Sequence, residues 1–306
     1  MNCMFCEASN ASFAYTASTR LHTQHKVHRC AECACLFLCP PPTDDELAQA
    51  YADDYYGEGT SKFAAPIERA VQWFREARSR RVSRYLKPGD LILDIGCGNG
   101  QFLTQMALRG YSAHGVERPG KAAERTAQLP NVHLHLGGFP HVSLNEHRFQ
   151  AITLWHVFEH LDDPKAAWDR IDQLLEAGGH LFLSLPNAAS WQCRWFGAHW
   201  FHLDPPRHLF LPTAQGLVRE LKRRGYRLRQ VRHFSLEQNP FGFVQSLLNR
   251  WIQPRDDLYE QLKTSGSPLS LQKVAFALLA IPAVFLSLAE AAFRRGGTIE
   301  LIAQKT

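Results

Sequence analysis

The feature that most constrains this chain is an alternation of short apolar segments with amphipathic helical segments, which begins at Leu91 and continues to the C-terminus. Short apolar strands separated by helices predict a parallel sheet that is covered by helices on both faces. The expected strands are Leu91–Ile95, Ser112–Val116, Val132–Leu136, Ala151–Leu154, His180–Leu185, Arg227–His233 and Ile299–Ala303. The expected helices are Gln101–Arg109, Gly120–Gln128, Pro164–Leu175 and Thr213–Arg224.

A glycine-rich loop, Asp94–Gly100 with the sequence DIGCGNG, follows the first expected strand. Glycines let the backbone turn sharply and approach a ligand closely. Dinucleotide sites use a similar strand, loop and helix, but two residues separate their second and third glycines. Here only Asn99 separates Gly98 from Gly100. Asp94 would also repel a pyrophosphate, so the loop predicts a ligand that carries positive charge instead of phosphate.

A second acidic residue, Glu117, ends the next expected strand. A carboxylate at that place can accept hydrogen bonds from both hydroxyls of a ribose. The pair of acids, Asp94 and Glu117, therefore favours a cationic ligand with a ribose over a chance glycine-rich turn beside an unrelated surface acid.

The chain resembles the class I S-adenosylmethionine-dependent methyltransferases in Asp94–Gly100, in Glu117 and in Leu154–Leu161, which reads LWHVFEHL. The last segment is similar to a bacterial group with HVxEH after the fourth strand, and the resemblance runs from about residue 80 to the C-terminus. It implies a doubly wound, Rossmann-like α/β sheet of seven strands with the last one antiparallel, and S-adenosylmethionine as the cofactor.

The residues that the resemblance assigns to the cofactor are Asp94, Gly96, Cys97, Gly98, Gly100, Glu117, Phe139 and His156. Many relatives carry an acidic residue after the third strand that contacts the adenine amine, whereas this chain has Leu136–Phe139. We therefore expect adenine to pack on Phe139 or to meet backbone groups.

The segment from His156 to His160 follows the fourth expected strand, at the edge of the sheet where the glycine loop lies. His160 is a candidate base or substrate-orienting residue, because a hydroxyl acceptor must lose a proton. Two alternatives are a histidine that caps a helix start and a divalent metal site, since some quinone O-methyltransferases that the chain resembles use acid-x-x-Glu-His as magnesium ligands. His156 replaces the first acid, which weakens the metal alternative because magnesium prefers oxygen ligands.

A second candidate base, His208, lies in the aromatic segment Trp200–Phe210 after the fifth expected strand. In sugar and small-molecule methyltransferases that the chain resembles, a histidine of this loop serves as the base, and His208 is the matching position. The alternative is a histidine that only makes a hydrogen bond within the loop.

Two CxxC pairs, Cys3 with Cys6 and Cys30 with Cys33, precede the methyltransferase-like region. Their spacing suits a structural zinc ribbon with four thiolate ligands, in a module too small to be stable on its core alone. Cys35 and Cys39 are expected to pack in the interior, although Cys35 could compete as a ligand.

Three zones follow from these patterns: a zinc-ribbon-like module over residues 1–42, a helical lead-in over 43–90 and the methyltransferase domain over 91–306. The lead-in begins with a predicted capping box formed by Thr43 and Glu46. No secretory signal precedes the cysteines, which predicts a cytoplasmic protein.

An apolar helical insertion is expected over residues 236–297, and its segment Val274–Ala289 carries no charge. A membrane crossing is disfavoured, because strands of one sheet flank the insertion on both sides. The segment therefore predicts either a helical lid or homodimer surface, or a helix that lies in the plane of the inner membrane surface.

The leading functional hypothesis is O-methylation, or else C-methylation, of a small molecule, a sugar or a lipid-linked acceptor. The formal charge of +5, from 34 basic and 29 acidic side chains, is too small to favour nucleic acid. An RNA methyltransferase is the first alternative, because a zinc ribbon precedes this domain in rRNA-modifying relatives, and a non-catalytic scaffold that binds S-adenosylmethionine is the second.

Overall fold

The structure is a computed structural model, and it describes residues 1–19, 23–51, 65–144, 148–252, 255–263 and 269–306. The chain divides into two compact units. The sheet unit consists of Asp53–Ser184, Leu221–Gln230 and Leu301–Thr306. The ribbon unit consists of Met1–Ala52, Leu185–Glu220 and Val231–Glu300.

The sheet unit is built on a seven-stranded sheet with the order β10-β11-β8-β7-β4-β5-β6. Pairing is parallel between β4 and β5, β5 and β6, β4 and β7, and β7 and β8, and the last strands are antiparallel. The strands are β4 (Leu91–Ile95), β5 (Ser112–Glu117), β6 (Val132–Leu136), β7 (Phe149–Trp155), β8 (Leu175–Pro186), β10 (Tyr226–Arg232) and β11 (Thr298–Lys305). The predicted doubly wound, Rossmann-like fold is confirmed.

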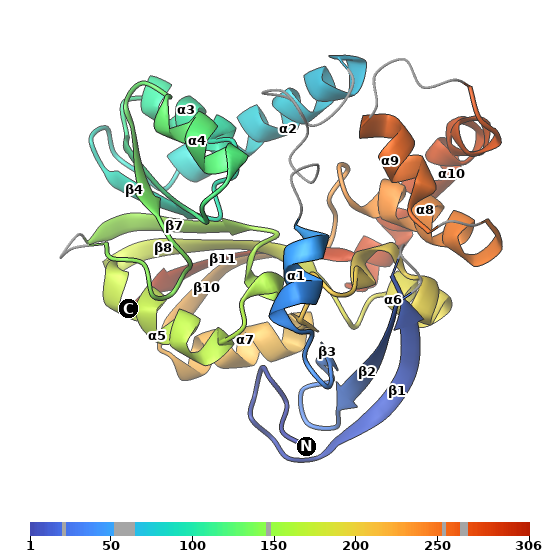
Figure 1. Cartoon of the computed structure of the whole chain (residues 1–306). Helices are drawn as coiled ribbons and strands as arrows, with labels where there is room; N and C mark the ends of the chain where they lie inside the picture. The colour runs from blue at the N-terminus through green and yellow to red at the C-terminus, as the bar shows by residue number, and fades with distance from the viewer. Residues whose placement is uncertain (20–22, 52–64, 145–147, 253–254, 264–268) are drawn as a thin grey trace. The chain divides into compact units, whose positions relative to one another are not determined.

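Helices cover both faces of this sheet, as the apolar strands require. Figure 1 shows α2 (Ala65–Ser83), α3 (Gln101–Leu108) and α4 (Lys121–Ala127) on one side, and α5 (Pro164–Leu174) on the other. The residues of β4 are buried on both faces, and Ile92 packs in one cluster with Leu103 and Met106 of α3. The central strand is therefore held rigidly, and the loop that follows it starts from a fixed point.

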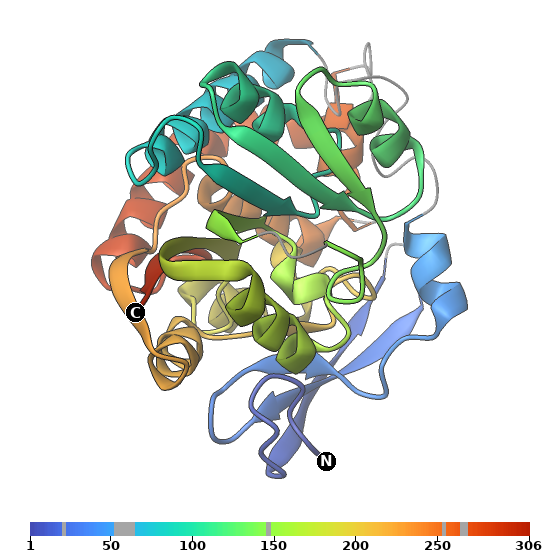
Figure 2. The same cartoon turned by 90° about the vertical axis from the view of Figure 1, so that its left-hand side faces the viewer.

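The N-terminal residues of the ribbon unit form β1 (Ala11–Ser18), β2 (Gln24–Cys30) and β3 (Leu36–Leu38), the blue strands of Figure 2. Their four-stranded sheet is completed by β9 (Phe210–Leu211), which pairs with β3 although it lies far away in the sequence. The helix α1 (Asp44–Ala50) follows, and its predicted capping box of Thr43 and Glu46 is confirmed.

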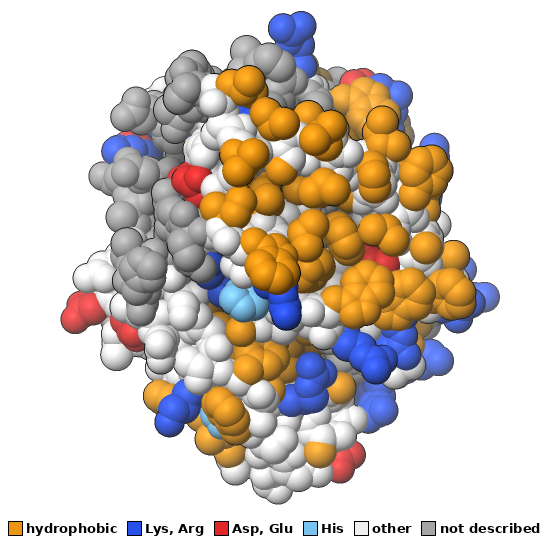
Figure 3. Space-filling model, turned by 90° about the vertical axis from the view of Figure 1, so that its right-hand side faces the viewer, with side chains coloured by type: hydrophobic (Ala, Val, Ile, Leu, Met, Phe, Trp, Pro, Cys, Tyr) orange, Lys and Arg blue, Asp and Glu red, His pale blue; other side chains and the backbone are white. Residues whose placement is uncertain are grey.

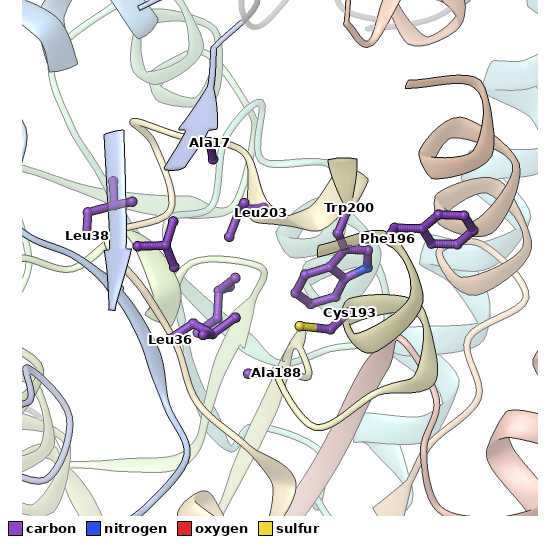
Figure 4. Close-up of a cluster of buried hydrophobic side chains, with 10 residues drawn as sticks. Ala17, Leu36, Leu38, Ala188, Cys193, Phe196, Trp200 and Leu203 are labelled. Atoms are coloured by element: carbon purple, nitrogen blue, oxygen red, sulfur yellow. The ribbon is translucent and has the colours of Figure 1, made fainter. Parts of the chain in front are cut away.

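A hydrophobic core joins these strands to the segment that follows β8. Leu36 and Leu38 of β3 lie in one cluster with Cys193 and Trp200, and Trp200 is completely buried (Figure 4). The segment contains α6 (Trp191–Phe196), η3 (Gly197–His199) and η4 (Phe201–Leu203) before β9. The cysteine module therefore does not pack as an independent domain, because it shares its hydrophobic core with this segment.

The expected helical insertion before the last strand is present. It consists of α8 (Asn239–Trp251), α9 (Asp257–Lys263) and α10 (Leu271–Ala292), while α7 (Ala214–Arg223) lies earlier, between β9 and β10. The helices α8 and α10 pack against each other through Val244, Leu248 and Ala283. Within the described residues, α10 is the one helix that is long and apolar enough to cross a membrane by length and composition.

Candidate functional site

The glycine loop after β4 has a backbone that only glycine accommodates easily. Gly96, Gly98 and Gly100 have φ angles of +70°, +55° and +68°, in the left-handed region. A Cβ atom at Gly96 would lie 2.5 Å from Cγ2 of Val157, and one at Gly100 would lie 2.5 Å from Cδ1 of Leu129. The positive φ angles and these close approaches explain why glycine occupies the positions. The amides of Gly96 and Cys97 donate to the carbonyl oxygen of Val116, over 2.8 and 3.1 Å, so the loop is held against the end of β5.

Glu117 lies at the end of β5 and is directly connected to the glycine loop. Its Oε2 atom accepts a hydrogen bond of 2.6 Å from the amide of Gly98, and Oε1 accepts one of 3.1 Å from the amide of Arg118. Its side chain is only 7% exposed. On the other side of the loop, the hydroxyl of Thr126 donates to the carbonyl oxygen of Gly98 over 2.7 Å. The carboxylate and the loop therefore form one preorganised cradle.

Asp94 is buried in β4 beneath the loop and accepts a hydrogen bond of 2.5 Å from the hydroxyl of Thr153 on β7. Burial, with a smaller contribution from the negative charge of Glu117, raises the pKa of Asp94 to about 7, against the opposing effects of the Thr153 hydrogen bond and the charge of Arg78. A cation placed above the loop would reverse this balance, because it stabilises the ionised form. The site is therefore adapted to a positively charged ligand.

Two other predicted cofactor residues, Cys97 and Phe139, are buried in the sheet unit. Burial raises the pKa of the Cys97 thiol well above its usual value, and a Cβ atom at Gly115 would lie 2.6 Å from its sulfur. The thiol thus points toward β5 and is neutral. Phe139 follows β6 after Gly137, and its contact with adenine stays a prediction.

The segment after β7 holds a histidine–carboxylate pair. His156 has a φ of +56°, and its Nδ1 atom lies 3.4 Å from Oε1 of Glu159, a fully buried carboxylate. Its Nε2 atom lies 3.3 Å from the hydroxyl of Ser184 on β8. Both ring nitrogens of His156 thus have polar neighbours within the protein, which fixes the orientation of the ring.

His160 is the last residue of η2 (Phe158–His160), and its amide donates to the carbonyl oxygen of Val157 over 2.9 Å. The alternative that a histidine caps the helix start here is wrong, because Asp163 caps α5 by accepting a hydrogen bond of 2.9 Å from the amide of Ala166. His160 remains a candidate base or substrate contact.

His208 belongs to the ribbon unit, and its ring has a defined hydrogen bond. The Nδ1 atom lies 2.7 Å from the carbonyl oxygen of His202, and the side chain is 9% exposed. Because a carbonyl oxygen can only accept, Nδ1 carries the proton, and in the neutral ring Nε2 is the basic nitrogen. The salt bridge between Arg207 and Asp204, at 2.7 Å, steadies the same loop.

The four predicted zinc ligands lie together in the ribbon unit. The sulfur atoms of Cys3, Cys6, Cys30 and Cys33 all lie within 4.8 Å of one another. The pairs Cys3–Cys33 and Cys6–Cys30 are 3.7 and 3.6 Å apart, close to the edge of about 3.8 Å that Zn–S bonds of about 2.3 Å require. A hydrogen bond from Cys33 is the main cause that lowers the pKa of Cys3, which favours a thiolate.

The two surplus cysteines of the ribbon are not among these four, although the thiol of Cys35 forms side-chain hydrogen bonds with Cys3 and Cys33. Cys35 is fully buried and its thiol donates to the carbonyl oxygen of Leu36 over 3.3 Å, while Cys39 is half-buried. The expectation that they pack in the interior is confirmed for Cys35. No disulfide is formed among the described cysteines.

Comparison with known proteins identifies the fold family. A family model described as a methyltransferase domain matches residues 68–231, more than half of the chain's 306 residues. The chain belongs to this methyltransferase family. Membership of this family supports S-adenosylmethionine as the cofactor. The assignment of Asp94, the three glycines and Glu117 to that cofactor stays a prediction.

Curated relatives match only part of the methyltransferase. A ubiquinone biosynthesis O-methyltransferase from Alkalilimnicola ehrlichii is 32% identical over 106 residues, which cover 32% of this chain and 42% of the relative. A tRNA U34 carboxymethyltransferase from Desulfotalea psychrophila is 25% identical over 165 residues, or 51% of this chain and 52% of the relative. The chain thus spans about half the length of these relatives or less.

Among solved structures, the plantazolicin methyltransferase BpumL, crystallised with a substrate analogue and S-adenosylhomocysteine, has a TM-score of 0.50 and 16% identity, with 85% of this chain and 94% of that chain covered. The [4+2]-cyclase SpnF also has a TM-score of 0.50, at 18% identity, with coverage of 75% and 80%. Both likenesses concern the fold alone.

Sequence reasoning missed two residues that support the methyltransferase site, Thr153 and Ser184, and considered Glu159 only as part of a possible metal site. Thr153 bonds Asp94, Ser184 lies beside His156, and Glu159 lies on the other side of the same ring. The acid of the HVxEH segment was a signal for Glu159. Thr153 and Ser184 are ordinary strand residues, and only the strand register places them beside their partners.

Replacing Glu117 with alanine is expected to weaken binding of S-adenosylmethionine by about ten- to a hundredfold, because a charge-assisted hydrogen bond contributes about 1.5–3 kcal/mol. Titration calorimetry measures the effect. The exposed acid Glu124 on α4 provides a control, since Glu124→Ala also removes a carboxylate without touching the loop. Equal affinity of the Glu117→Ala variant and the unchanged protein would remove Glu117 from the cofactor site.

Affinity for S-adenosylmethionine is also expected to rise with pH up to about 7, the pKa of Asp94, and to level off above it. Below pH 7 binding of the cation must release the proton of Asp94, so the dissociation constant changes by up to about tenfold per pH unit. The Asp94→Asn variant should bind more weakly and lose this dependence. A flat pH profile of the unchanged protein between pH 5.5 and 7 would contradict the assignment.

Proposed function

We propose that this chain is an enzyme that transfers a methyl group from S-adenosylmethionine to an oxygen atom of a small molecule, a sugar or a lipid-linked acceptor. S-adenosylmethionine supplies a methyl group on a positively charged sulfur. The chain's own residues must align the acceptor and take up the proton of its hydroxyl. If the acceptor atom is a carbon, the proton that is removed comes from that carbon instead of from a hydroxyl group.

The observation that carries the oxygen acceptor is the hydrogen bond from Nδ1 of His208 to the carbonyl oxygen of His202. It fixes the tautomer and leaves Nε2 as the nitrogen that can receive a proton. In the chain, His208 lies on the segment that directly follows β8. The likeness to a ubiquinone biosynthesis O-methyltransferase supports the same reaction class.

The decisive experiment is a labelling screen with the purified protein. S-adenosylmethionine labelled on its methyl group is incubated with separated cell-extract fractions of polar metabolites, lipids, glycans and RNA. Label is expected in a metabolite, glycan or lipid fraction, and mass spectrometry of the product should locate it on oxygen. The Glu117→Ala variant, which binds the donor weakly, is the control for enzymatic transfer.

RNA is the second candidate acceptor, and the likeness to a tRNA U34 carboxymethyltransferase over half of the chain favours it. Label in the RNA fraction alone would establish this alternative, and a steep salt dependence of RNA binding would support it. If S-adenosylmethionine binds and no fraction takes up label, the chain is a non-catalytic scaffold. The cyclase with the same fold shows that the fold does not fix the reaction.

A further inference from the structure

The helix α10 has two faces of opposite character. One face is packed into the ribbon unit and contains the buried residues Gln272, Ala283, Ser287 and Glu290. The other face carries large apolar side chains that are 39–76% exposed, at a spacing of three and four residues: Leu271, Val274, Leu278, Ile281, Phe285 and Leu288. We call the second set the α10 apolar face. A stretch of 18 consecutive residues in the helix α10 has a mean hydropathy of 2.1, and only 17% of that stretch is buried.

The C-terminal end of α10 joins an aromatic cluster at its surface. The ring of Trp191 lies 5.1 Å from that of Phe293 and 5.5 Å from that of Trp195, measured between centroids. Phe293 is 67% and Trp195 is 47% exposed. Aromatic side chains of this kind are typical of the boundary between hydrocarbon and lipid headgroups.

Basic residues accompany the same end of the helix. Arg194 precedes Trp195, while Arg294 and Arg295 follow Phe293, and all three are exposed. Figure 3 shows a broad hydrophobic surface with a group of Lys and Arg side chains along its lower edge. The 22 residues of α10 contain one acid, Glu290, which is completely buried. The exposed surface of α10 itself thus carries no negative charge.

The packed face ties α10 to the protein at both ends. Near the start, Nε2 of Gln272 donates to Oδ2 of Asp257 over 2.6 Å. Near the end, Glu290 accepts hydrogen bonds from the amide and side chain of Gln192, over 3.1 and 2.9 Å. Insertion across a membrane would break these contacts and place Glu290 in hydrocarbon, which is costly. The helix can therefore meet a membrane only lengthwise.

We infer that the α10 apolar face binds in the plane of a bilayer whose headgroups are anionic, with Arg194, Arg294 and Arg295 at the headgroups. The α10 apolar face could instead form a dimer interface with a second copy of the chain. The lipid surface is favoured because the exposed apolar area extends beyond the row to Trp195 and Phe293. The arginines beside it match anionic lipid, and each contributes about fivefold to partitioning.

Vesicle co-sedimentation of the full chain tests this inference. Binding to vesicles of phosphatidylcholine mixed with phosphatidylglycerol is expected to exceed binding to phosphatidylcholine alone by about tenfold or more, and to fall with added salt. The double variant Leu278→Glu with Ile281→Glu should lower binding by about tenfold or more. Arg294→Gln with Arg295→Gln should remove most of the preference for the anionic vesicles.

The matched control is Leu108→Glu, at a leucine of α3 in the sheet unit that is 77% exposed and lies outside this surface. It should bind vesicles like the unchanged chain. Absence of vesicle binding, or equal binding of the Leu278 and Ile281 double variant, would overturn the inference. So would a dimer in analytical ultracentrifugation that the double variant dissociates, because the second copy would then be the occupant.

This inference goes beyond the proposed function, and the two can fail separately. Vesicle binding needs neither S-adenosylmethionine nor an acceptor, while methyl transfer to a detergent-solubilised acceptor needs no vesicle. If both hold, the inner surface of the cytoplasmic membrane is where the protein would meet a lipid-linked acceptor.

Discussion

Replacing His208 with asparagine is expected to lower kcat by about a hundredfold or more, since a general base contributes about 10²–10⁴ to a reaction of this type. The side-chain amide of asparagine can replace the donation from Nδ1 to the carbonyl oxygen of His202, so the loop keeps its hydrogen bond. What is lost is the basic nitrogen Nε2. The affinity for S-adenosylmethionine should stay within a few-fold of the original, because the glycine loop is untouched.

The rate measurement uses the acceptor found by the labelling screen, with kcat and KM recorded separately. Loss of a base should lower kcat and leave KM for S-adenosylmethionine within a few-fold of its original value. His133→Asn, at an exposed histidine of β6, is the control for a histidine substitution in general. If His208→Asn keeps its rate and His160→Ala loses it, the base is His160 instead. If both keep the rate, neither histidine is the base.

The sheet and its cofactor loop could be predicted from the sequence because their signals are local. The strand from Leu91 to Ile95 is apolar except for Asp94, the loop glycines have φ angles that glycine adopts most easily, and Glu117 ends the next strand. Each of these patterns depends on a few consecutive residues. The seven-stranded sheet with its antiparallel last strand was implied by the family resemblance, while the connection rules of parallel sheets only restrict the possible strand orders.

The ribbon was predicted less completely, because part of it comes from a distant segment. The four cysteines are recognisable by spacing, but nothing local shows that Phe210 and Leu211 add a fourth strand beside β3. That pairing depends on complementary packing around Trp200, 0% exposed, which only the folded chain defines. The same limit applies to the helical insertion: its apolar character was visible, but its packed and exposed faces were not.

The separation of α10 into two faces shows why composition alone misleads here. Val274–Ala289 has no charge and is apolar enough to suggest a membrane span. Glu290 follows this segment directly and lies on the packed face of α10. Its buried carboxylate accepts two hydrogen bonds from Gln192, which hold that face against the protein. Burial raises the pKa of Glu290 to about 7, against the two hydrogen bonds from Gln192, which favour the ionised carboxylate.

Removal of zinc is expected to unfold the cysteine end of the ribbon unit. We propose that Cys3, Cys6, Cys30 and Cys33 bind one zinc ion per chain, and a structural zinc of this type contributes about 10 kcal/mol or more to folding. Metal analysis of the purified protein should find about one zinc per chain. The Cys6→Ser variant should lose the metal and melt at a much lower temperature, with its methyl transfer reduced.

Loss of zinc should also disturb the position of His208, because the cysteine end contacts the segment on which that residue lies. The hydroxyl of Thr213 donates to the carbonyl oxygen of Cys33 over 2.9 Å, and the ring of Phe5 lies 6.2 Å from that of Phe210. Cys39→Ser, at a half-buried cysteine outside the cluster, should keep both zinc and stability. The opposite outcome is a metal-free protein whose four ribbon thiols react with a thiol reagent and whose melting temperature does not change when zinc is added. It would show that packing alone stabilises this unit.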